Sequence, residues 1–449
     1  MTASLKTGGG EAEPRRNVFV LGYDEDHDRE IEAVCEPERY AFHPLLMSDE
    51  LIQQDAYDIE ALLDEARKIL DDFAGNVDAI ICHWDFPAMP LHSILCREYK
   101  VKAPSLEAVL KCAHKYWSRL EQRKAAPEAT PDFSVFDPHD EDALDQIDVD
   151  YPFWIKPIKG FSSMLGFLIE KEADFRDAMK QTRREIGRLG DPFEQILKHV
   201  DLPDELKDIH GDFMIAERYI TGDELAPEGH VQNGECQAHA VVDMVFSENG
   251  KSFQRYEYPS VAPDDIQKRA SEIAARVMEH IGFDDGCFNM EFFWNREEEK
   301  LWIVEINPRI SQSHSNIFKK VDGISNHEVA IKMALGEEPG IIKGEGEFKR
   351  AAKFLYRRFD TGDGIAERVP TDADTRRLRE KQPHTRVQIL LQENMKLSEL
   401  KEQDSYSYCM AHLQIGARDR EELERKFEEA KECLPFEIRT LEEGEVESA

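Results

Sequence analysis

The sequence has no long hydrophobic run, no closely spaced cysteines and few basic residues relative to its acidic ones. No apolar stretch approaches the roughly 20 residues that a membrane-spanning helix requires, so we expect no association with a membrane. Residues 1–16 lack the apolar centre of a secretory signal and are predicted to be a flexible arm. These absences favour a cytoplasmic location.

The cysteines argue against two kinds of scaffold. There are eight, scattered along the chain with no CxxC spacing. A zinc ribbon needs paired cysteines, and a disulfide framework is typical of short secreted chains. Reduced thiols are therefore expected.

The charge balance argues against nucleic-acid partners. Lysine and arginine total 57 against 92 acidic residues, for a formal net charge of −35. Such a surface repels a polyphosphate backbone, although a local basic pocket can still bind a nucleotide. The acidic excess is also compatible with a salty habitat, and composition alone leaves both explanations open.

Alternating strands and helices occupy the first quarter of the chain. The apolar runs NVFVLGYD, RYAFHPLL and VDAIICHWD alternate with helical stretches over 24–35, 58–73 and MPLHSILCREY. This alternation predicts a parallel sheet with helices on its faces. Ligands gather at the carboxyl ends of such strands, so Tyr23, Asp24 and Trp84 either contact a substrate or are ordinary loop residues.

A continuous helix is predicted over 105–125, with Ser105 as its N-cap and Lys115 on its surface. An acidic connection follows, and then the apolar strand FWIKP. Lys156 lies near the end of this strand, which is an unusual position for a charged side chain unless an anion binds it. The next segment, KGFSSMLG, has small residues that let backbone N–H groups approach a phosphate, although an ordinary hairpin loop is equally compatible. Its small residues are Gly160, Ser162, Ser163 and Gly166.

The segment AERYITGDE places Glu217 and Glu224 on either side of a glycine turn. Its exposed backbone near Tyr219 could bind an adenine edge, and Glu224 could accept from ribose hydroxyl groups. An edge strand with acidic ends is the simpler alternative.

A hairpin is predicted from GCFNMEFFW and LWIVEINPR. A symmetric turn centred on Glu298 would place Glu291 opposite Glu305, and like charges in that arrangement are destabilising. A divalent cation between them would remove the repulsion, with Asn307 as a third oxygen ligand and Arg309 as an anion clamp. Two unrelated acids at a solvated hairpin end are the alternative.

Taken in order, these segments resemble the ATP-grasp superfamily: a lysine helix, a K-P-x-x-G-x-x-S flap, an E-x-x-x-x-G-x-E hinge, and a glutamate followed by E-x-N-x-R. The resemblance spans about residues 17–435 and is greatest to the biotin-carboxylase-like branch and its L-amino acid ligases. It implies a mixed α/β and α+β fold in which a Rossmann-like domain with a parallel sheet precedes a lid and a metal-binding antiparallel sheet. The implied divisions are an arm at 1–16, an α/β domain at 17–112, an ATP-grasp domain at 113–340 with its lid at about 151–220, a small C-terminal β-rich lobe at 341–436 and an acidic tail at 437–449.

The resemblance also implies a role for each candidate residue. Lys115 and Lys156 would contact the phosphates of ATP, with Lys156 and Arg309 as catalytic residues. Glu217 and the backbone at Tyr219 would bind adenine, and Glu224 would bind ribose. The remaining roles are the flap at 160–166 over the phosphates, Mg²⁺ (or Mn²⁺) on Glu291, Glu305 and Asn307, a carboxylate substrate on Arg309, and an acceptor near Ser311, Ser313 and His314.

The activity implied by the resemblance is an ATP-dependent carboxylate–amine ligase. It would join small-molecule substrates through an acylphosphate and release ADP and phosphate, with an amino acid as substrate and a homodimer as a possible assembly. Biotin carboxylases have a Glu-His pair where this chain has Ser313 and His314, which argues against activation of bicarbonate. A carboxylase, a synthase that uses a thiol or ammonia, and a non-catalytic nucleotide-binding regulator are the alternatives.

Overall fold

The computed structural model describes residues 14–24, 31, 38–51, 57–160, 165–247, 252–359, 362–400, 403–404 and 406–441. Four predictions therefore lie wholly or mostly outside the described residues: the helix at 24–35, Ser162, Ser163, and the acidic tail at 437–449, of which residues 442–449 are not described.

A three-stranded parallel sheet with the order β2-β1-β3 opens the fold. The side chains of β1 from Val18 to Leu21 are almost fully buried, as expected of a strand covered on both faces. The prediction of a parallel α/β start is confirmed. Its elements are β1 (Arg16–Tyr23), β2 (Tyr40–Met47), α2 (Ser48–Leu51), α3 (Ile59–Asp72), β3 (Ala79–Cys82) and α4 (Ala88–Tyr99).

The continuous helix predicted over 105–125 is wrong, because His114 divides it into α5 (Leu106–Ala113) and α6 (Lys115–Ala125). His114 has extended backbone angles and accepts a hydrogen bond from Trp117 N, so it is the N-cap of α6. Ser105 caps α5 as predicted. The break makes Lys115 the first residue of a helix, and its backbone N–H donates to Ile158 O beside the predicted flap.

A four-stranded antiparallel sheet forms the lid, with the order β4-β7-β5-β6. Its elements are β4 (Phe133–Phe136), β5 (Phe153–Pro157), β6 (Phe167–Ile169), α7 (Glu172–Glu185), α8 (Gly187–Leu197) and β7 (Met214–Arg218). The lid was predicted to begin near residue 151, but β4 pairs with β7 and so belongs to it. The acidic composition after Pro127 concealed this strand, whose apolar part is only the four residues FSVF.

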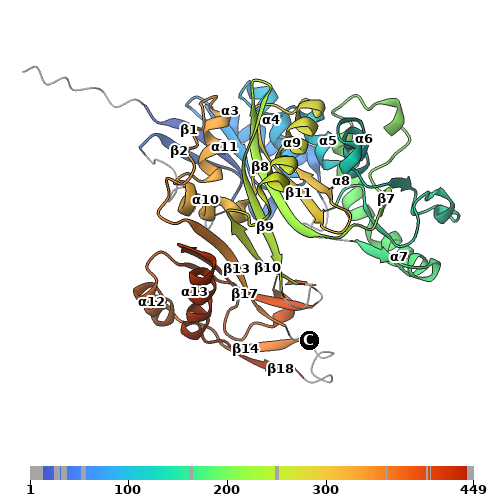
Figure 1. The fold of residues 1–449 in the computed structure, drawn as a ribbon. Helices are drawn as coiled ribbons and strands as arrows, with labels where there is room; N and C mark the ends of the chain where they lie inside the picture. The colour runs from blue at the N-terminus through green and yellow to red at the C-terminus, as the bar shows by residue number, and fades with distance from the viewer. Residues whose placement is uncertain are drawn as a thin grey trace, which may run out of the picture.

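A nine-stranded sheet forms the centre of the molecule (Figure 1). Its main path runs β12-β11-β8-β9-β10-β13-β17-β15, and β16 pairs with β17. The strands are β8 (Asp223–Gln232), β9 (Glu235–Phe246), β10 (Phe253–Tyr258), β11 (Gly286–Asn295), β12 (Lys300–Asn307), β13 (Arg350–Arg358), β15 (Arg386–Ile389), β16 (Gln403–Asp404) and β17 (Ser407–Ala417). Three helices accompany them: α9 (Asp264–Ile281), α10 (Ser315–Asp322) and α11 (Asn326–Ala334).

The C-terminal lobe shares this sheet instead of forming its own, because β13 pairs with β10. Helix α13 (Arg420–Cys433) packs on the lobe, and Phe427 stacks on Phe354 with ring centroids 4.1 Å apart. The lobe also contains α12 (Asp372–Lys381), β14 (Gly364–Arg368) and β18 (Glu437–Thr440). Strand β18 pairs with β14, so residues 437–440 are part of the fold and not of the predicted tail.

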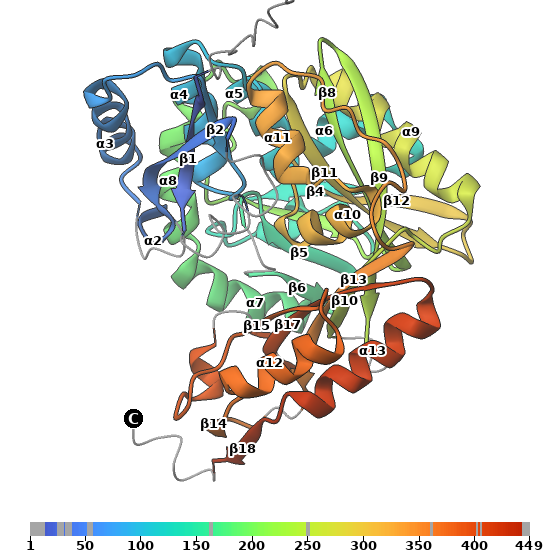
Figure 2. The same ribbon diagram turned by 90° about the vertical axis from the view of Figure 1, so that its left-hand side faces the viewer.

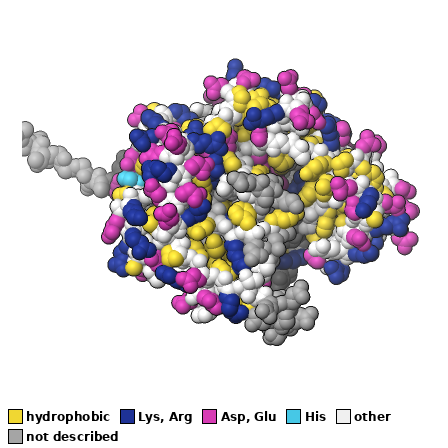
Figure 3. Space-filling model, turned by 60° about the horizontal axis from the view of Figure 1, so that its bottom comes forward, with side chains coloured by type: hydrophobic (Ala, Val, Ile, Leu, Met, Phe, Trp, Pro, Cys, Tyr) yellow, Lys and Arg dark blue, Asp and Glu magenta, His cyan; other side chains and the backbone are white. Residues whose placement is uncertain are grey.

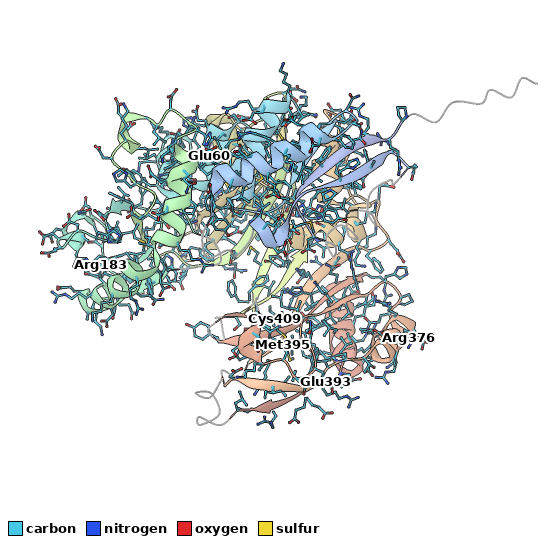
Figure 4. The ribbon with its side chains drawn as sticks, turned by 180° about the vertical axis from the view of Figure 1, so that it is seen from behind. Glu60, Arg183, Arg376, Glu393, Met395 and Cys409 are labelled. Atoms are coloured by element: carbon cyan, nitrogen blue, oxygen red, sulfur yellow. The ribbon has the colours of Figure 1, made fainter. Side chains whose placement is uncertain are left out.

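The first domain lies at the upper left of Figure 2 and the C-terminal lobe at the bottom, whereas α7 and β7 of the lid lie at the right of Figure 1. Seen from behind, Arg183 on α7, Glu60 on α3 and Arg376 on α12 mark these three parts (Figure 4). The cavity described below is lined by residues of the lid, the central sheet and the C-terminal lobe.

Acidic and basic side chains are interspersed on the face of the molecule in Figure 3. Within the described part of the chain, no helix combines the length and apolarity needed to cross a membrane. The seven cysteines among those residues are free thiols.

Candidate functional site

A cavity of about 1030 Å³ lies between the lid and the central sheet. Most of the residues predicted for nucleotide and metal binding line it, although they are spread over about 190 positions of sequence. They are Lys115, Lys156, Gly160, Gly166, Glu217, Tyr219, Glu224, Glu291 and Glu305.

The hairpin of β11 and β12 places Glu291 directly opposite Glu305, as predicted. The reason is different from the predicted symmetric turn. Asn295 pairs with Lys300, which corresponds to a turn shifted by half a residue, and a β-bulge at Val304 then restores the register. The carbonyl group of Val304 accepts a hydrogen bond from Arg119 of α6 at 2.9 Å. The bulge is therefore held by a side chain from outside the hairpin.

The two opposed carboxylates compete for a proton in the absence of a cation. Loss of solvation and the charge of Glu305 raise the pKa of Glu291 to about 7. Asn307 donates to Glu291 at 3.1 Å and accepts from Arg309 at 3.2 Å. Two acidic oxygens and an amide oxygen on one face fit a hard divalent cation, which takes its remaining ligands from phosphates and water. Within the described residues, no group of three or more His, Cys, Asp or Glu side chains is arranged to hold a metal by itself.

Lys115 connects the hairpin of β11 and β12 to Gly160, at the start of the predicted flap. Its ammonium group lies 3.2 Å from Glu305 Oε2 and donates to Gly160 O at 3.0 Å. Burial alone would raise the pKa of Glu305, but Lys115 and Lys156 outweigh burial and lower it. Glu305 is thus the ionised partner of the pair and Glu291 the one that takes up a proton.

Lys156 on β5 is held by Glu217 on β7, with 2.7 Å between Nζ and Oε2. The other oxygen of Glu217 accepts from Arg119 at 2.7 Å. Burial would raise the pKa of Glu217, but Arg119 and Lys156 together lower it to about 2. Contact between Glu217 and adenine stays a prediction, and the observed ion pairs give this carboxylate a second task, which is to position Lys156.

The hinge between the lid and the central sheet presents Tyr219 and Glu224 to the cavity. Tyr219 is exposed, with 41% of its surface accessible to solvent. Burial and the charge of Glu291 raise the pKa of Glu224. The hinge thus offers an aromatic side chain and a carboxyl group that readily holds a proton.

The loop after Arg309 differs from the prediction at His314. This histidine was expected to face an acceptor substrate, but its side chain is 1% exposed and lies 2.6 Å from the fully buried Glu228. Asn326 donates to the other oxygen of Glu228 at 2.5 Å and to Ser311 O at 2.7 Å. His314 therefore anchors the loop and cannot contact a substrate in this structure.

The same loop contacts two other parts of the molecule. Ser313 accepts a hydrogen bond from Lys353 of β13 at 3.2 Å, and Gln312 donates to His83 O after β3 at 3.2 Å. The segment that follows Arg309 is thus bonded to the C-terminal lobe and to the first domain as well as to the central sheet.

Three residues of the site were missed from the sequence: Asp85, Arg119 and Lys159. Lys159 Nζ lies 2.9 Å from Asp85 Oδ1, and Arg309 Nη2 lies 3.7 Å from Asp85 Oδ2. Asp85 directly follows Trp84, one of the residues singled out at a carboxyl strand end, so the position was within reach of the strand-end rule. Nothing in the sequence distinguishes Lys159 and Arg119 from surface residues.

Comparison with known proteins agrees with this arrangement. Residues 149–316 match the family model described as the ATP-grasp domain. Biotin carboxylase 1 of Bacillus subtilis is 23% identical over 260 residues, which cover 57% of this chain and 53% of that protein. The chain thus spans about half the length of this curated relative.

Two solved structures have the same fold over almost the whole chain. The L-amino acid ligase of Bacillus licheniformis has a TM-score of 0.68 and 16% identity, covering 94% of this chain and 98% of the other. The biotin carboxylase of Campylobacter jejuni has a TM-score of 0.62 and 15% identity, with 94% and 92% covered. At these identities the likeness shows a shared fold alone.

Proposed function

This chain contains an ATP-grasp domain, and on that premise we propose that the protein is an ATP- and Mg²⁺-dependent carboxylate–amine ligase. It phosphorylates a small carboxylate, transfers the acyl group to an amine and releases ADP and phosphate. The observation that carries the proposal is the opposition of Glu291 and Glu305 beside Lys115 in a cavity large enough for a nucleotide.

The charges in the cavity suit exchange of partners when MgATP enters. Lys115 and Lys156 now neutralise Glu305 and Glu217. Phosphate oxygens can take over as partners of the lysines, and Glu305 is then available to a divalent cation. Mg²⁺, when bound to Glu291, Glu305 and Asn307, would supply neutralisation of the charge that builds up on the transferring phosphoryl group.

The first chemical step is the attack of the substrate carboxylate on the γ-phosphoryl group. Arg309 can hold that carboxylate in line, because its guanidinium group is fixed by hydrogen bonds to Asn307 Oδ1 and Ile310 O at 3.2 Å each. A carboxylate oxygen forms the new P–O bond as the bond to the ADP oxygen breaks. The work of the protein in this step is positioning and charge neutralisation.

The second step converts the acylphosphate into an amide. The amine nitrogen attacks the acyl carbon, phosphate leaves with the electron pair of the broken C–O bond, and the amine loses a proton. Water must be excluded while the acylphosphate exists, because hydrolysis would waste it. The lid sheet above the cavity is suited to this task.

A carboxylase is the rival suggested by the similarity to biotin carboxylases. It is disfavoured because His314 is bonded to Glu228 and buried, so the histidine at this position does not form an acid–histidine pair that faces the site. A regulator that only binds nucleotide would not need Glu291, Glu305 and Arg309 together.

The test is a trapping assay with hydroxylamine as the amine. Purified protein is incubated with MgATP, hydroxylamine and single carboxylic acids, including the common L-amino acids. Hydroxamate and ADP are then measured in parallel. Equal amounts of both products support the proposal, and the absence of hydroxamate with every acid tested would refute it. A homodimer stays a prediction, to be measured by light scattering.

A further inference from the structure

The loop that follows β3 brings an acid from the first domain to the catalytic arginine. Trp84 fixes this loop, because its indole N–H donates to Gly22 O at 2.7 Å and its ring packs where a Cβ on Gly22 would lie. On the other side, His83 O accepts from Gln312. The loop that carries Asp85 is therefore fixed by hydrogen bonds to β1 and to the segment after Arg309, and it places Asp85 beside Arg309.

The two oxygens of Asp85 have different surroundings. Oδ1 accepts a hydrogen bond from Lys159 at 2.9 Å, and the Lys159 side chain is only 3% exposed. Oδ2 faces Arg309 at 3.7 Å, which is too long for a hydrogen bond. The Asp85 and Arg309 side chains are 25% and 21% exposed, so both remain accessible while Lys159 is covered.

Asp85 stays ionised in this setting. Burial would raise its pKa, but the charges of Lys159 and Arg309 outweigh burial and hold the pKa well below its ordinary value. An ionised carboxylate whose second oxygen has an ion-pair partner at 3.7 Å but accepts no hydrogen bond from the described residues is a strong acceptor for an ammonium group.

An α-amino acid carries its carboxylate and its ammonium group on one carbon atom. Arg309 and Asp85 present the complementary charges side by side. We propose that Asp85 binds the α-ammonium group of the acid substrate, on Oδ2, while Arg309 binds its carboxylate. The inference rests on the proposed function and narrows it, because the acid that is phosphorylated is then an α-amino acid.

The same geometry disfavours acids without an amino group. A simple carboxylate, or bicarbonate, would meet the negative charge of Asp85 beside Arg309 with no group to neutralise it. Lys159 contributes by occupying Oδ1 and so fixing the direction of Oδ2. Lys159 is thus a positioning residue, and Asp85 is the residue that determines specificity.

The test compares amino acids with their des-amino analogues in the hydroxylamine assay. The pairs are L-alanine with propionate, L-leucine with isocaproate, and L-phenylalanine with hydrocinnamate. The wild-type protein should form hydroxamate from at least one amino acid and much less from its analogue. Asp85→Asn should raise the half-saturating concentration of that amino acid by about 10- to 100-fold, because one charged hydrogen bond is lost. It should lower that of the analogue, because the negative charge that disfavours an acid without an amino group is removed.

Two further variants separate recognition from structure. Asp85→Asn leaves Lys159 buried without its acid, so Asp85→Asn/Lys159→Met removes both charges and should show the same loss of preference. Asp285→Asn is the matched control, because Asp285 has the same side-chain exposure of 25% and pairs with Lys102 at 2.7 Å. MgADP affinity, followed by the fluorescence of Trp154 and Trp294 in the cavity, should stay within about twofold in all variants.

Each outcome bears on a separate proposal. If the wild-type protein converts des-amino acids as readily as amino acids, or if the double variant keeps the wild-type preference, the role of Asp85 is refuted and the ligase proposal stands. If the wild-type protein forms hydroxamate from neither class, the ligase proposal fails and this inference falls with it.

Discussion

Two carboxylates on the same face of the central sheet, Glu228 and Glu291, have opposite surroundings. Asn289 of β11 pairs with Glu228 on one side and with Asn307 on the other, so Glu228 faces the same way as Glu291 two residues along β11. Glu228 has its oxygens bonded to His314 and Asn326 and is fully buried. Glu291 instead lies directly beside Glu305, a like charge on the neighbouring strand, and both residues line the cavity.

The difference shows how structural and functional acids can be distinguished in one sheet. A carboxylate whose charge and hydrogen bonds are satisfied within the protein stabilises the fold and has no capacity left for a ligand. A carboxylate left beside a like charge destabilises the ligand-free protein and gains most from a bound cation. The residue type alone does not distinguish a structural acid from a functional one, but the hydrogen-bond and ion-pair partners of its carboxylate do.

The largest expected effect is on turnover at the unsatisfied pair. Glu305→Gln removes a metal ligand and the partner of Lys115, and should lower the rate of hydroxamate formation by at least about 10²- to 10³-fold. Its melting temperature should stay close to that of the wild-type protein, because the like-charge repulsion with Glu291 and the ion pair with Lys115 are lost together. Turnover within tenfold of wild type would contradict the metal role.

Substitution of Glu228, whose hydrogen bonds are made within the protein, should instead lower stability and leave nucleotide binding almost unchanged. Glu228→Ala leaves His314 and Asn326 buried without their partner and should lower the free energy of unfolding by about 3 kcal/mol. Urea denaturation with and without MgADP measures this. Since Glu228 does not line the cavity, the affinity of the folded fraction for MgADP should change little. An unchanged midpoint of urea denaturation together with lost MgADP binding would show that Glu228 has a functional role and not a structural one.

A smaller effect is expected from pH. Glu291 has its pKa raised to about 7, and a metal ligand must be deprotonated. The affinity for Mn²⁺ in the presence of ADP should therefore increase as pH rises from 6 to 8 and change little above pH 8. Glu291→Gln provides the background, because any dependence that remains belongs to the nucleotide.

The raised pKa of Glu291 affects the stability of the metal-free protein in the opposite direction from its effect on metal affinity. The folded protein holds a proton on Glu291 that the unfolded chain loses near pH 4.5, so without a metal the wild-type protein should lose stability relative to Glu291→Gln as pH rises from about 4.5 to 7. The comparison with the variant cancels the opposite contribution of buried histidines such as His92 and His114, whose pKa is lowered by burial. Mg²⁺ with ADP should abolish this relative decline. A difference between the two melting temperatures that stays constant over the same range without metal would show that Glu291 is not protonated in the folded state.

The pattern of the sequence was sufficient for the elements and for much of the site. Apolar runs predicted the parallel start, and the alternation in the hairpin predicted Glu291 opposite Glu305. The parallel start was predicted correctly because it depends on periodicity along single strands. The opposition of Glu291 and Glu305 was predicted correctly although the turn is shifted, because a β-bulge at Val304 restores the register. The predictions were wrong where the local sequence pattern does not indicate the structure. The helix at 105–125 is interrupted at His114, and a strand of four residues lies within an acidic segment.

What the sequence by itself determined is the local geometry of each strand, since side-chain alternation is a property of the backbone. Only the tertiary structure decided which charges meet. Asp85, Lys159 and Arg309 come from three separate segments, and Glu228 meets His314 across 86 residues of sequence. Electrostatic energy depends on distance in space, so the division between anchored and available acids is settled by packing.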